Sequence, residues 1–351
     1  MSFLQRQILN SEINFPVCLA PMVGLSHVAI RKEVARYMPK GAKTIWPTEM
    51  LNSRRLHSEN IEKTPETMRA PEETHLVPQI LANEEVHIRK SMRVLEDWGA
   101  QGVDINMGCP VKKALKHNYG VALMGDINYA AEVVRVTKSA TELPVSVKLR
   151  AGHQDDLGFL GEFVDAMQES GASWLCLHPR IASEKRKGRA RWGQVGFVRD
   201  RLSIPVIGNG DVQCSQDVHD YNQLTNCDMV MVGRALMARP WLLWQIGEDL
   251  GFEAPIDFLE GQNAPRTSFD EGKEFHQFAK RVLYSTFEIY NPSLAIRKYR
   301  YFIKTASPWL SFGNHLTNLM MRSDQAEGLA KLLDDFFSKP QAMLAKTDLR
   351  I

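Results

Sequence analysis

Short apolar runs alternate with amphipathic stretches along the first two thirds of the chain. The stretches between the runs carry apolar residues at spacings of three and four, as in 83–100 and 160–172, which predicts helices. Eight runs rich in β-branched and apolar residues occupy positions 17–24, 44–50, 76–82, 103–108, 145–152, 174–180, 206–212 and 229–235. Alternating strands and helices indicate a parallel sheet.

Signals for helix ends support this reading. We expect Asn83 to cap one helix at its N-terminus, and Gly99 and Gly171 to lie near the C-termini of two helices. Eight consecutive strand–helix units predict a (β/α)8 TIM barrel, whose active site lies at the carboxyl ends of the strands. A doubly wound sheet is the alternative, and the count of eight favours the barrel.

The pattern changes near residue 268. Helical patterns without intervening strands cover 269–290, 292–306, 309–321 and 323–337. Pro255, Gly261 and Pro265 mark the stretch before them as irregular. We therefore expect a barrel over 1–254, a linker over 255–267 and a small helical domain over 268–351.

Composition narrows the class of protein. The 351 residues include 44% hydrophobic residues, enough for a sizeable core, and the 43 basic and 41 acidic side chains give a net charge of +2. This balance by itself does not require a nucleic-acid partner, so local basic clusters matter. Five cysteines without a CxxC pair argue against a disulfide framework and a zinc site. We expect a cytoplasmic monomer without a metal, a leader or a membrane span.

Polar and glycine residues end several of the predicted strands, so a barrel would bring them to one mouth. They are Cys109, Lys148, His178, Arg180, Asn209, Gly210 and Gly233. The two glycines, with Arg234 beside them, favour a phosphate site. Lys148 lies within an apolar run, where a lysine needs a partner. It could form an ion pair, act as a Schiff-base nucleophile or stand beside a flavin.

Cys109 differs from the other cysteines by its position. It ends a strand and precedes Pro110, with Lys112 and Lys113 close by, so we expect an exposed, electropositive thiol. A thiol can give a proton to carbon, and a thiolate can attack as a nucleophile. The long connection 109–126 is typical of a functional lid. For the remaining cysteines we expect packing roles as small buried side chains: Cys18, Cys176, Cys214 and Cys227.

Several motifs together resemble the flavin-dependent tRNA-dihydrouridine synthases, with a pattern closest to the bacterial B-type branch. The most specific is NMGCPVKK, followed by GVALM, and the others appear in family order: APMVGLSHVAIR, TEM, VPQI, VSVKLRAG, LHPR, PVIGNGDV and MVGRALMARPWL. The resemblance implies an FMN-holding barrel with a C-terminal helical domain. It also implies reduction of the C5=C6 bond of uridine in tRNA with hydride derived from NADPH.

The resemblance also implies roles for individual residues. Cys109 would be the general acid, and substrate would be bound by Asn106, Lys113 and Arg180. FMN would be bound by Pro21, Met22, Val23, Gln79, Lys148, His178, Asn209, Gly210, Asp211, Gly233 and Arg234. The chain departs from the family pattern at Pro179 and Ile181, where a glycine or alanine and a threonine are common, and at Val121.

Three local clusters of cations predict an RNA-binding groove: 180–192, 297–304 and 112–117. The target base must also leave its stack to be reached. Two alternatives remain at this point. One is an FMN barrel acting on a small enoate or dihydropyrimidine, which would need no basic loops. The other is a Schiff-base lyase that uses Lys148.

Overall fold

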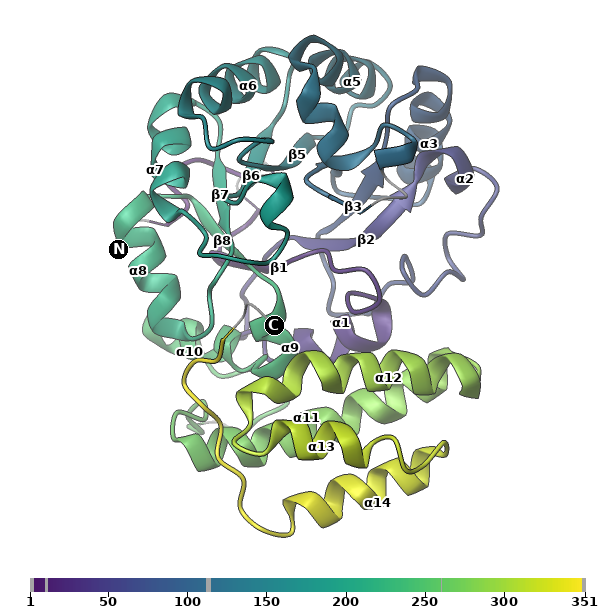
Figure 1. Cartoon of the computed structure of the whole chain (residues 1–351), viewed down its shortest axis with the longest axis vertical. Helices are drawn as coiled ribbons and strands as arrows, with labels where there is room; N and C mark the ends of the chain where they lie inside the picture. The colour runs from purple at the N-terminus through teal and green to yellow at the C-terminus, as the bar shows by residue number, and fades with distance from the viewer. Residues whose placement is uncertain (1–2, 10–11, 112–114, 260, 349–351) are drawn as a thin grey trace.

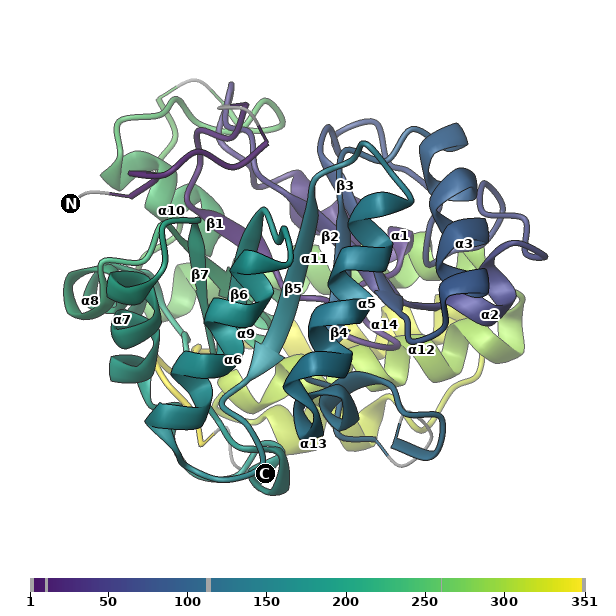
Figure 2. The same ribbon diagram turned by 90° about the horizontal axis from the view of Figure 1, so that it is seen from above.

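The computed structural model describes residues 3–9, 12–111, 115–259 and 261–348. Eight parallel strands form a nearly closed barrel with alternating helices, in the order β1-β8-β7-β6-β5-β4-β3-β2 (Figures 1 and 2). The strands are β1 Val17–Leu19, β2 Trp46–Asn52, β3 Leu76–Leu81, β4 Val103–Met107, β5 Val145–Arg150, β6 Trp174–His178, β7 Val206–Asn209 and β8 Met229–Val232. The predicted fold is confirmed, and each strand overlaps a predicted run, with β2 continuing beyond its run of 44–50 to Asn52.

Helices follow the strands around the barrel. They are α1 Val28–Ala35, α2 Ser53–Leu56, α3 Glu85–Asp97, α5 Ile127–Ser139, α6 Leu157–Glu169, α7 Trp192–Arg201, α8 Ser215–Thr225, α9 Arg234–Ala238 and α10 Leu242–Asp249. Glu84, not Asn83, is the N-cap of α3. The Asn83 amide instead donates to the His117 carbonyl oxygen at 2.8 Å, so a tertiary contact overrides the local capping signal.

The strands β1 and β2 stand at the two ends of the hydrogen-bonded order. The Thr44 hydroxyl donates to the Val17 carbonyl oxygen at 2.7 Å and so ties the two ends together. β-Branched and aliphatic side chains of the strands fill the barrel wall, with Val17, Val147 and Val230 all fully buried. The strand ends are thereby fixed against one another, which makes them a rigid base for a site.

Four helices pack below the barrel in Figure 1: α11 Ser268–Ile289, α12 Pro292–Ala306, α13 Gly313–Leu319 and α14 Ala326–Phe337. Buried polar contacts join α11 to the barrel. Glu271 accepts from Arg239 at 3.0 Å and from the indole of Trp241 at 3.0 Å. Glu33 on α1 accepts from Ser285 at 2.5 Å. These contacts fix the helical part against the barrel.

The chain after α14 returns to the barrel. The Arg239 guanidinium donates to the carbonyl oxygens of Leu344 and Ala345, and Lys346 pairs with Asp217 at 2.5 Å.

In the described part of the chain, no helix is long and apolar enough to cross a membrane.

Candidate active site

A cavity of about 710 Å³ opens at the carboxyl ends of the strands. Fourteen of the fifteen residues that the sequence predicts for the site line it: Pro21, Met22, Val23, Gln79, Asn106, Cys109, Lys148, His178, Arg180, Asn209, Gly210, Asp211, Gly233 and Arg234. The fifteenth, Lys113, lies outside the described residues, as does Lys112. The seven residues that the strand-end argument brings to one mouth are among the fourteen, so this argument places distant stretches of the sequence around one cavity.

A buried chain of hydrogen bonds leads across β3 and β4 to Cys109. The Gln79 amide donates to the Asp104 carboxylate at 2.6 Å, and the Gln79 carbonyl oxygen accepts from the Asn106 amide at 2.7 Å. The Asn106 carbonyl oxygen then accepts the backbone N–H groups of Gly108 at 3.1 Å and Cys109 at 2.9 Å. These bonds fix the orientation of the Gln79 and Asn106 side-chain amides. They also hold the backbone of Cys109, which positions its thiol.

Gly120 and Val121 hold the other side of the Cys109 backbone. The Val121 N–H donates to the Cys109 carbonyl oxygen at 3.1 Å. Gly120 has a φ of +61°, and a Cβ atom there would stand 2.6 Å from that oxygen. Only glycine fits this close approach without a shift of the backbone.

Arg150 is a residue of the site that the sequence analysis missed. Its Nε donates to the Gly108 carbonyl oxygen at 2.8 Å, and its Nη2 donates to the Lys185 carbonyl oxygen at 2.8 Å. Burial lowers the pKa of Arg150 to about 10, and the neighbouring Arg180 adds to this effect. The available signal was its position two residues after Lys148, because alternate residues of a strand point to the same side.

The environment of Cys109 favours the protonated thiol. Burial raises the pKa of Cys109, and a backbone hydrogen bond and the charges of Arg150 and Lys148 oppose that rise only in part. Cys109 is half-buried, as is Cys214, whereas Cys18, Cys176 and Cys227 are buried. The prediction of a buried side chain is wrong for Cys214, which is the half-buried N-cap residue of α8.

Lys148 reaches across the barrel from β5 to β7. Its Nζ donates to the Asn209 side-chain oxygen at 3.0 Å, and the Asn209 amide donates to the Met231 carbonyl oxygen at 2.7 Å. The ammonium group has three donors, so this contact leaves hydrogens that can point into the cavity. Lys148 is therefore positioned as a cation at the cavity wall.

Arg180 was predicted to bind substrate, but its guanidinium is buried and paired within the protein. Its guanidinium forms an ion pair with Asp211 at 2.6 Å and donates to the carbonyl oxygens of Lys187 and Gly188. Its Nη1 lies 3.0 Å from the His178 Nε2 atom. Burial lowers the pKa of His178 strongly, with nearby cations adding to the effect, so the ring is neutral and can accept this hydrogen bond. A direct contact of Arg180 with substrate stays a prediction.

Glycines shape the wall near β7 and β8. Gly210 has a φ of +118°, and a Cβ atom there would stand 3.0 Å from Ala190 and 3.1 Å from the His178 ring. At Gly233 a Cβ atom would stand 3.2 Å from the Met22 sulfur. Larger residues would narrow the cavity beside Arg234.

Some cations of the predicted basic clusters are exposed, and others are paired within the protein. In 180–192, four cations are exposed, namely Lys185, Arg186, Lys187 and Arg189, whereas Arg191 pairs with Glu184 and Asp155. In 297–304, Arg297 and Lys304 are exposed.

Two cations of the second cluster have structural contacts. Lys298 lies between Glu49 and Glu66, with nitrogen–oxygen distances of 3.7 and 3.8 Å. Arg300 donates to Asp324 and to the carbonyl oxygens of Met320 and Ser323. The charges of Lys298 and Arg300 are thus paired within the protein, and a contact of these two residues with RNA stays a prediction.

No group of three or more His, Cys, Asp or Glu residues in the described ranges could hold a metal ion.

The fold and the cavity are those of a (β/α)8-barrel protein with a thiol site at its strand ends. The model of the dihydrouridine synthase (Dus) family matches residues 18–307, and the chain belongs to this family.

Two curated relatives match this chain over much of the length of both proteins. A probable tRNA-dihydrouridine synthase of Rhizobium leguminosarum bv. phaseoli is 33% identical over 64% of this chain and 69% of its own length. tRNA-dihydrouridine synthase B of Proteus vulgaris is 27% identical over 84% of this chain and 85% of its own length. The crystal structure of TcOYE with pHBA has a TM-score of 0.48 and 8% identity over 69% of this chain and 91% of that chain, too low a likeness to carry an argument.

Proposed function

We propose that this chain reduces uridine to 5,6-dihydrouridine in tRNA, with FMN as cofactor, NADPH as reductant and Cys109 as the proton donor. The observation that carries the proposal is the half-buried thiol, held by Asn106 and Gly120 at the wall of a cavity that also contains Lys148 and Arg234. Membership of the dihydrouridine synthase family and the names of the curated relatives support this choice of reaction and of tRNA.

The residues of the cavity fit a flavin. Lys148 keeps ammonium hydrogens for an electron-rich ring edge, and Gln79 keeps one amide hydrogen after its contact with Asp104. The close contacts around Gly210 and Gly233 leave backbone exposed where a larger side chain would intrude, next to the cation of Arg234. We assign the binding of FMN to these residues together with Pro21, Met22, Val23, His178, Asn209 and Asp211. When bound, the flavin supplies hydride to carbon.

Cys109 supplies the other hydrogen of the reaction. The C5=C6 double bond of uracil gains hydride at C6, and C5 takes the proton from the Cys109 sulfur, which becomes a thiolate and regains a proton from water. The raised pKa of Cys109 keeps that proton on the sulfur before the reaction. Asn106 retains one amide hydrogen after its contact with Gln79, and we assign this hydrogen to a carbonyl oxygen of the uracil.

Arg150 and the basic loop serve the substrate. Arg150 places a cation beside the loop that carries Cys109, where it can balance negative charge that develops on the uracil. Lys185 and Arg186 line the cavity, and Lys187 and Arg189 are exposed beside them, so the loop offers positive charge to RNA phosphates. This loop favours RNA over a small enoate as the substrate.

The test is direct. The purified protein should show a flavin absorption spectrum. With NADPH and tRNA from a strain that lacks its own dihydrouridine synthases, it should form dihydrouridine, measured by mass spectrometry of the nucleosides. A flavin-containing protein that oxidises NADPH with a small enoate and forms no dihydrouridine in any tRNA would contradict the proposal.

A further inference from the structure

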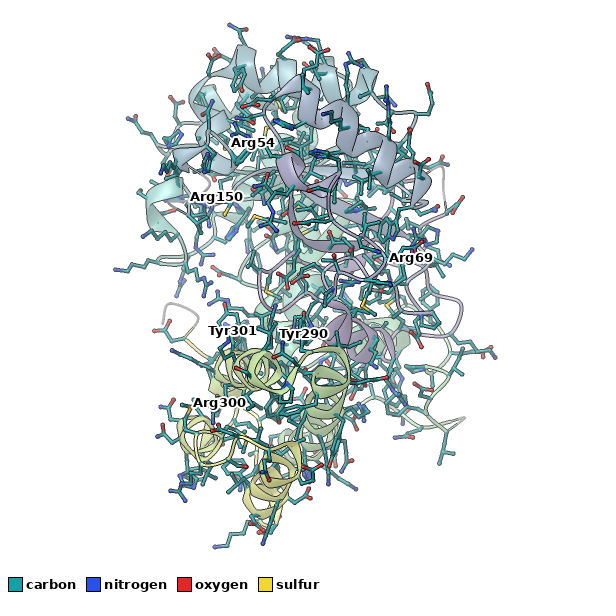
Figure 3. All side chains as sticks on the ribbon, turned by 90° about the vertical axis from the view of Figure 1, so that its right-hand side faces the viewer. Arg54, Arg69, Arg150, Tyr290, Arg300 and Tyr301 are labelled. Atoms are coloured by element: carbon teal, nitrogen blue, oxygen red, sulfur yellow. The ribbon has the colours of Figure 1, made fainter. Side chains whose placement is uncertain are left out.

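The helical part of the chain contributes directly to the cavity. Tyr301 and Thr305 of α12 line it, together with residues of the barrel. Figure 3 shows Tyr301 on the side of α12 that faces the barrel and Arg300 on another side of the same helix. The cavity is therefore completed by a second structural unit, and Tyr301 is the aromatic side chain that this unit provides.

A fixed contact positions this face of α12. Lys298, Tyr301 and Thr305 follow one another at spacings of three and four, so they share one face of the helix. Lys298 is half-buried between Glu49 and Glu66, and its Nζ lies 5.3 Å from the centre of the Tyr290 ring. The charge pairs and the cation–π contact hold the face against the barrel.

The same carboxylate positions the barrel loop beneath Tyr301. Glu49 accepts the backbone N–H of Gly24 at 2.8 Å. Gly24 has a φ of +83°, and a Cβ atom there would stand 3.2 Å from the Tyr301 ring. The ring thus packs on bare backbone, which limits its freedom to turn away from the cavity.

The exposure of Tyr301 has no explanation in core packing. Its neighbours Tyr299 and Phe302 are fully buried in the helical core, whereas Tyr301 is 36% exposed. Gln79 and Asn106 deeper in the cavity are 0% and 6% exposed. Tyr301 therefore stands at the solvent end, through which a polymeric substrate has to enter.

We propose that the Tyr301 ring stacks on a nucleobase of the RNA substrate at the mouth of the cavity. A base that leaves its stack needs new contacts with its flat faces, and aromatic side chains provide them. Lys185 and Arg186 line the same cavity and can hold the adjoining phosphates. This inference rests on the proposed function, because it requires an RNA substrate.

The experiment compares three variants of the whole flavin-loaded protein. Tyr301→Ala removes the ring, Tyr301→Phe keeps the ring without the hydroxyl, and Tyr284→Ala removes an exposed tyrosine of α11 that does not line the cavity. We expect Tyr301→Ala to weaken tRNA binding by about 5- to 150-fold, the range that base–aromatic stacking typically gives, with an unchanged flavin spectrum. Tyr301→Phe and Tyr284→Ala should bind tRNA within about twofold of the native protein.

Three results would overturn the inference. They are unchanged tRNA binding in Tyr301→Ala, an equal loss in Tyr301→Phe, and loss of flavin in place of tRNA affinity. The first means that the ring does not contact RNA, the second that the hydroxyl is the interacting group, and the third that the ring contacts the cofactor. Dihydrouridine formation by the native protein is measured alongside. If the native protein forms dihydrouridine while one of these results holds, the stacking inference fails and the proposed function stands.

Discussion

The backbone N–H of Cys109 donates to the side-chain oxygen of Asn106 at 2.9 Å, and this contact links the thiol to the buried hydrogen bonds of β3 and β4. The amide of Asn106 is oriented by Gln79, and Gln79 is oriented by Asp104. A change at Asn106 should therefore alter the position of the sulfur without touching it. The contact makes Asn106 both a substrate-binding candidate and a support for Cys109.

We predict that Asn106→Ala lowers dihydrouridine formation more than tRNA binding. The substitution leaves the Gln79 oxygen and the N–H groups of Gly108 and Cys109 without their partner, at a cost of about 1–3 kcal/mol for each buried group left unpaired. Single-turnover rates and tRNA affinity, measured separately, test this.

Asn106→Asp is the matched control for the acceptor. It keeps an oxygen for the two backbone N–H groups and loses the donor to Gln79. If both variants turn over at the native rate, Asn106 neither positions the thiol nor binds the uracil.

A second prediction concerns the thiol itself. Cys109→Ala should still bind flavin, accept hydride from NADPH and bind tRNA, because none of these steps needs the sulfur. Loss of a general acid typically costs about 10² to 10⁴ in rate, so single-turnover dihydrouridine formation should fall by that factor. Cys214→Ala, which removes the other half-buried thiol, should keep native turnover. Rapid oxidation of reduced flavin by tRNA in Cys109→Ala would mean that the proton comes from another group.

A third prediction follows from the pKa of Cys109, which burial raises above its ordinary value. A general acid works only when protonated, so the single-turnover rate should stay constant below this pKa and fall as the pH rises through it. Alkylation by iodoacetamide requires the thiolate, so it should be slow at neutral pH and accelerate over the same alkaline range. A thiol that is alkylated fully and rapidly at pH 7 would be inconsistent with burial as the dominant effect.

The sequence predicted the parts of the site that depend on topology. The apolar runs located the strands, and a parallel barrel brings strand ends together, so Cys109, Lys148 and Asn209 could be placed around one cavity before any coordinates. The family resemblance then supplied the candidate roles, which remain to be tested.

Pairing between distant residues could not be predicted in the same way. Arg180 and Lys298 looked like free cations in the sequence, but Asp211 and Glu49 neutralise them in the structure. Neither partner lies close enough along the chain to produce a local pattern. The return of the tail to Arg239 and the contact of Tyr301 with Gly24 depend in the same way on tertiary packing.

Lys148 gives a fourth prediction. Lys148→Ala removes the cation at the cavity wall and leaves the Asn209 oxygen without its donor at 3.0 Å. The purified variant should therefore lose flavin or bind it far more weakly, measured by absorbance after dialysis and by titration with FMN. Lys63→Ala, at an exposed lysine outside the cavity, is the control. Native flavin affinity in a folded Lys148→Ala protein would remove Lys148 from the cofactor site.

The last prediction concerns the basic loop. Arg186, Lys187 and Arg189 are exposed, and Arg186 lines the cavity, so their charges are available to phosphates. Reversing all three to glutamate should weaken tRNA binding and reduce its dependence on salt, because each cation that contacts a phosphate contributes about 0.7–0.9 to the slope of log K against log salt. The flavin spectrum should not change, since the loop cations lie outside the residues assigned to FMN.

A matched control separates specific contacts from net charge. Lys90, Arg93 and Arg135 are exposed on the outer helices α3 and α5, and reversing them changes the net charge by the same amount. If RNA reads only the net charge of the protein, the two triple variants should lose affinity equally. If the loop contacts RNA directly, the loop variant alone should show both the weaker binding and the flatter salt dependence, measured by filter binding across a series of salt concentrations.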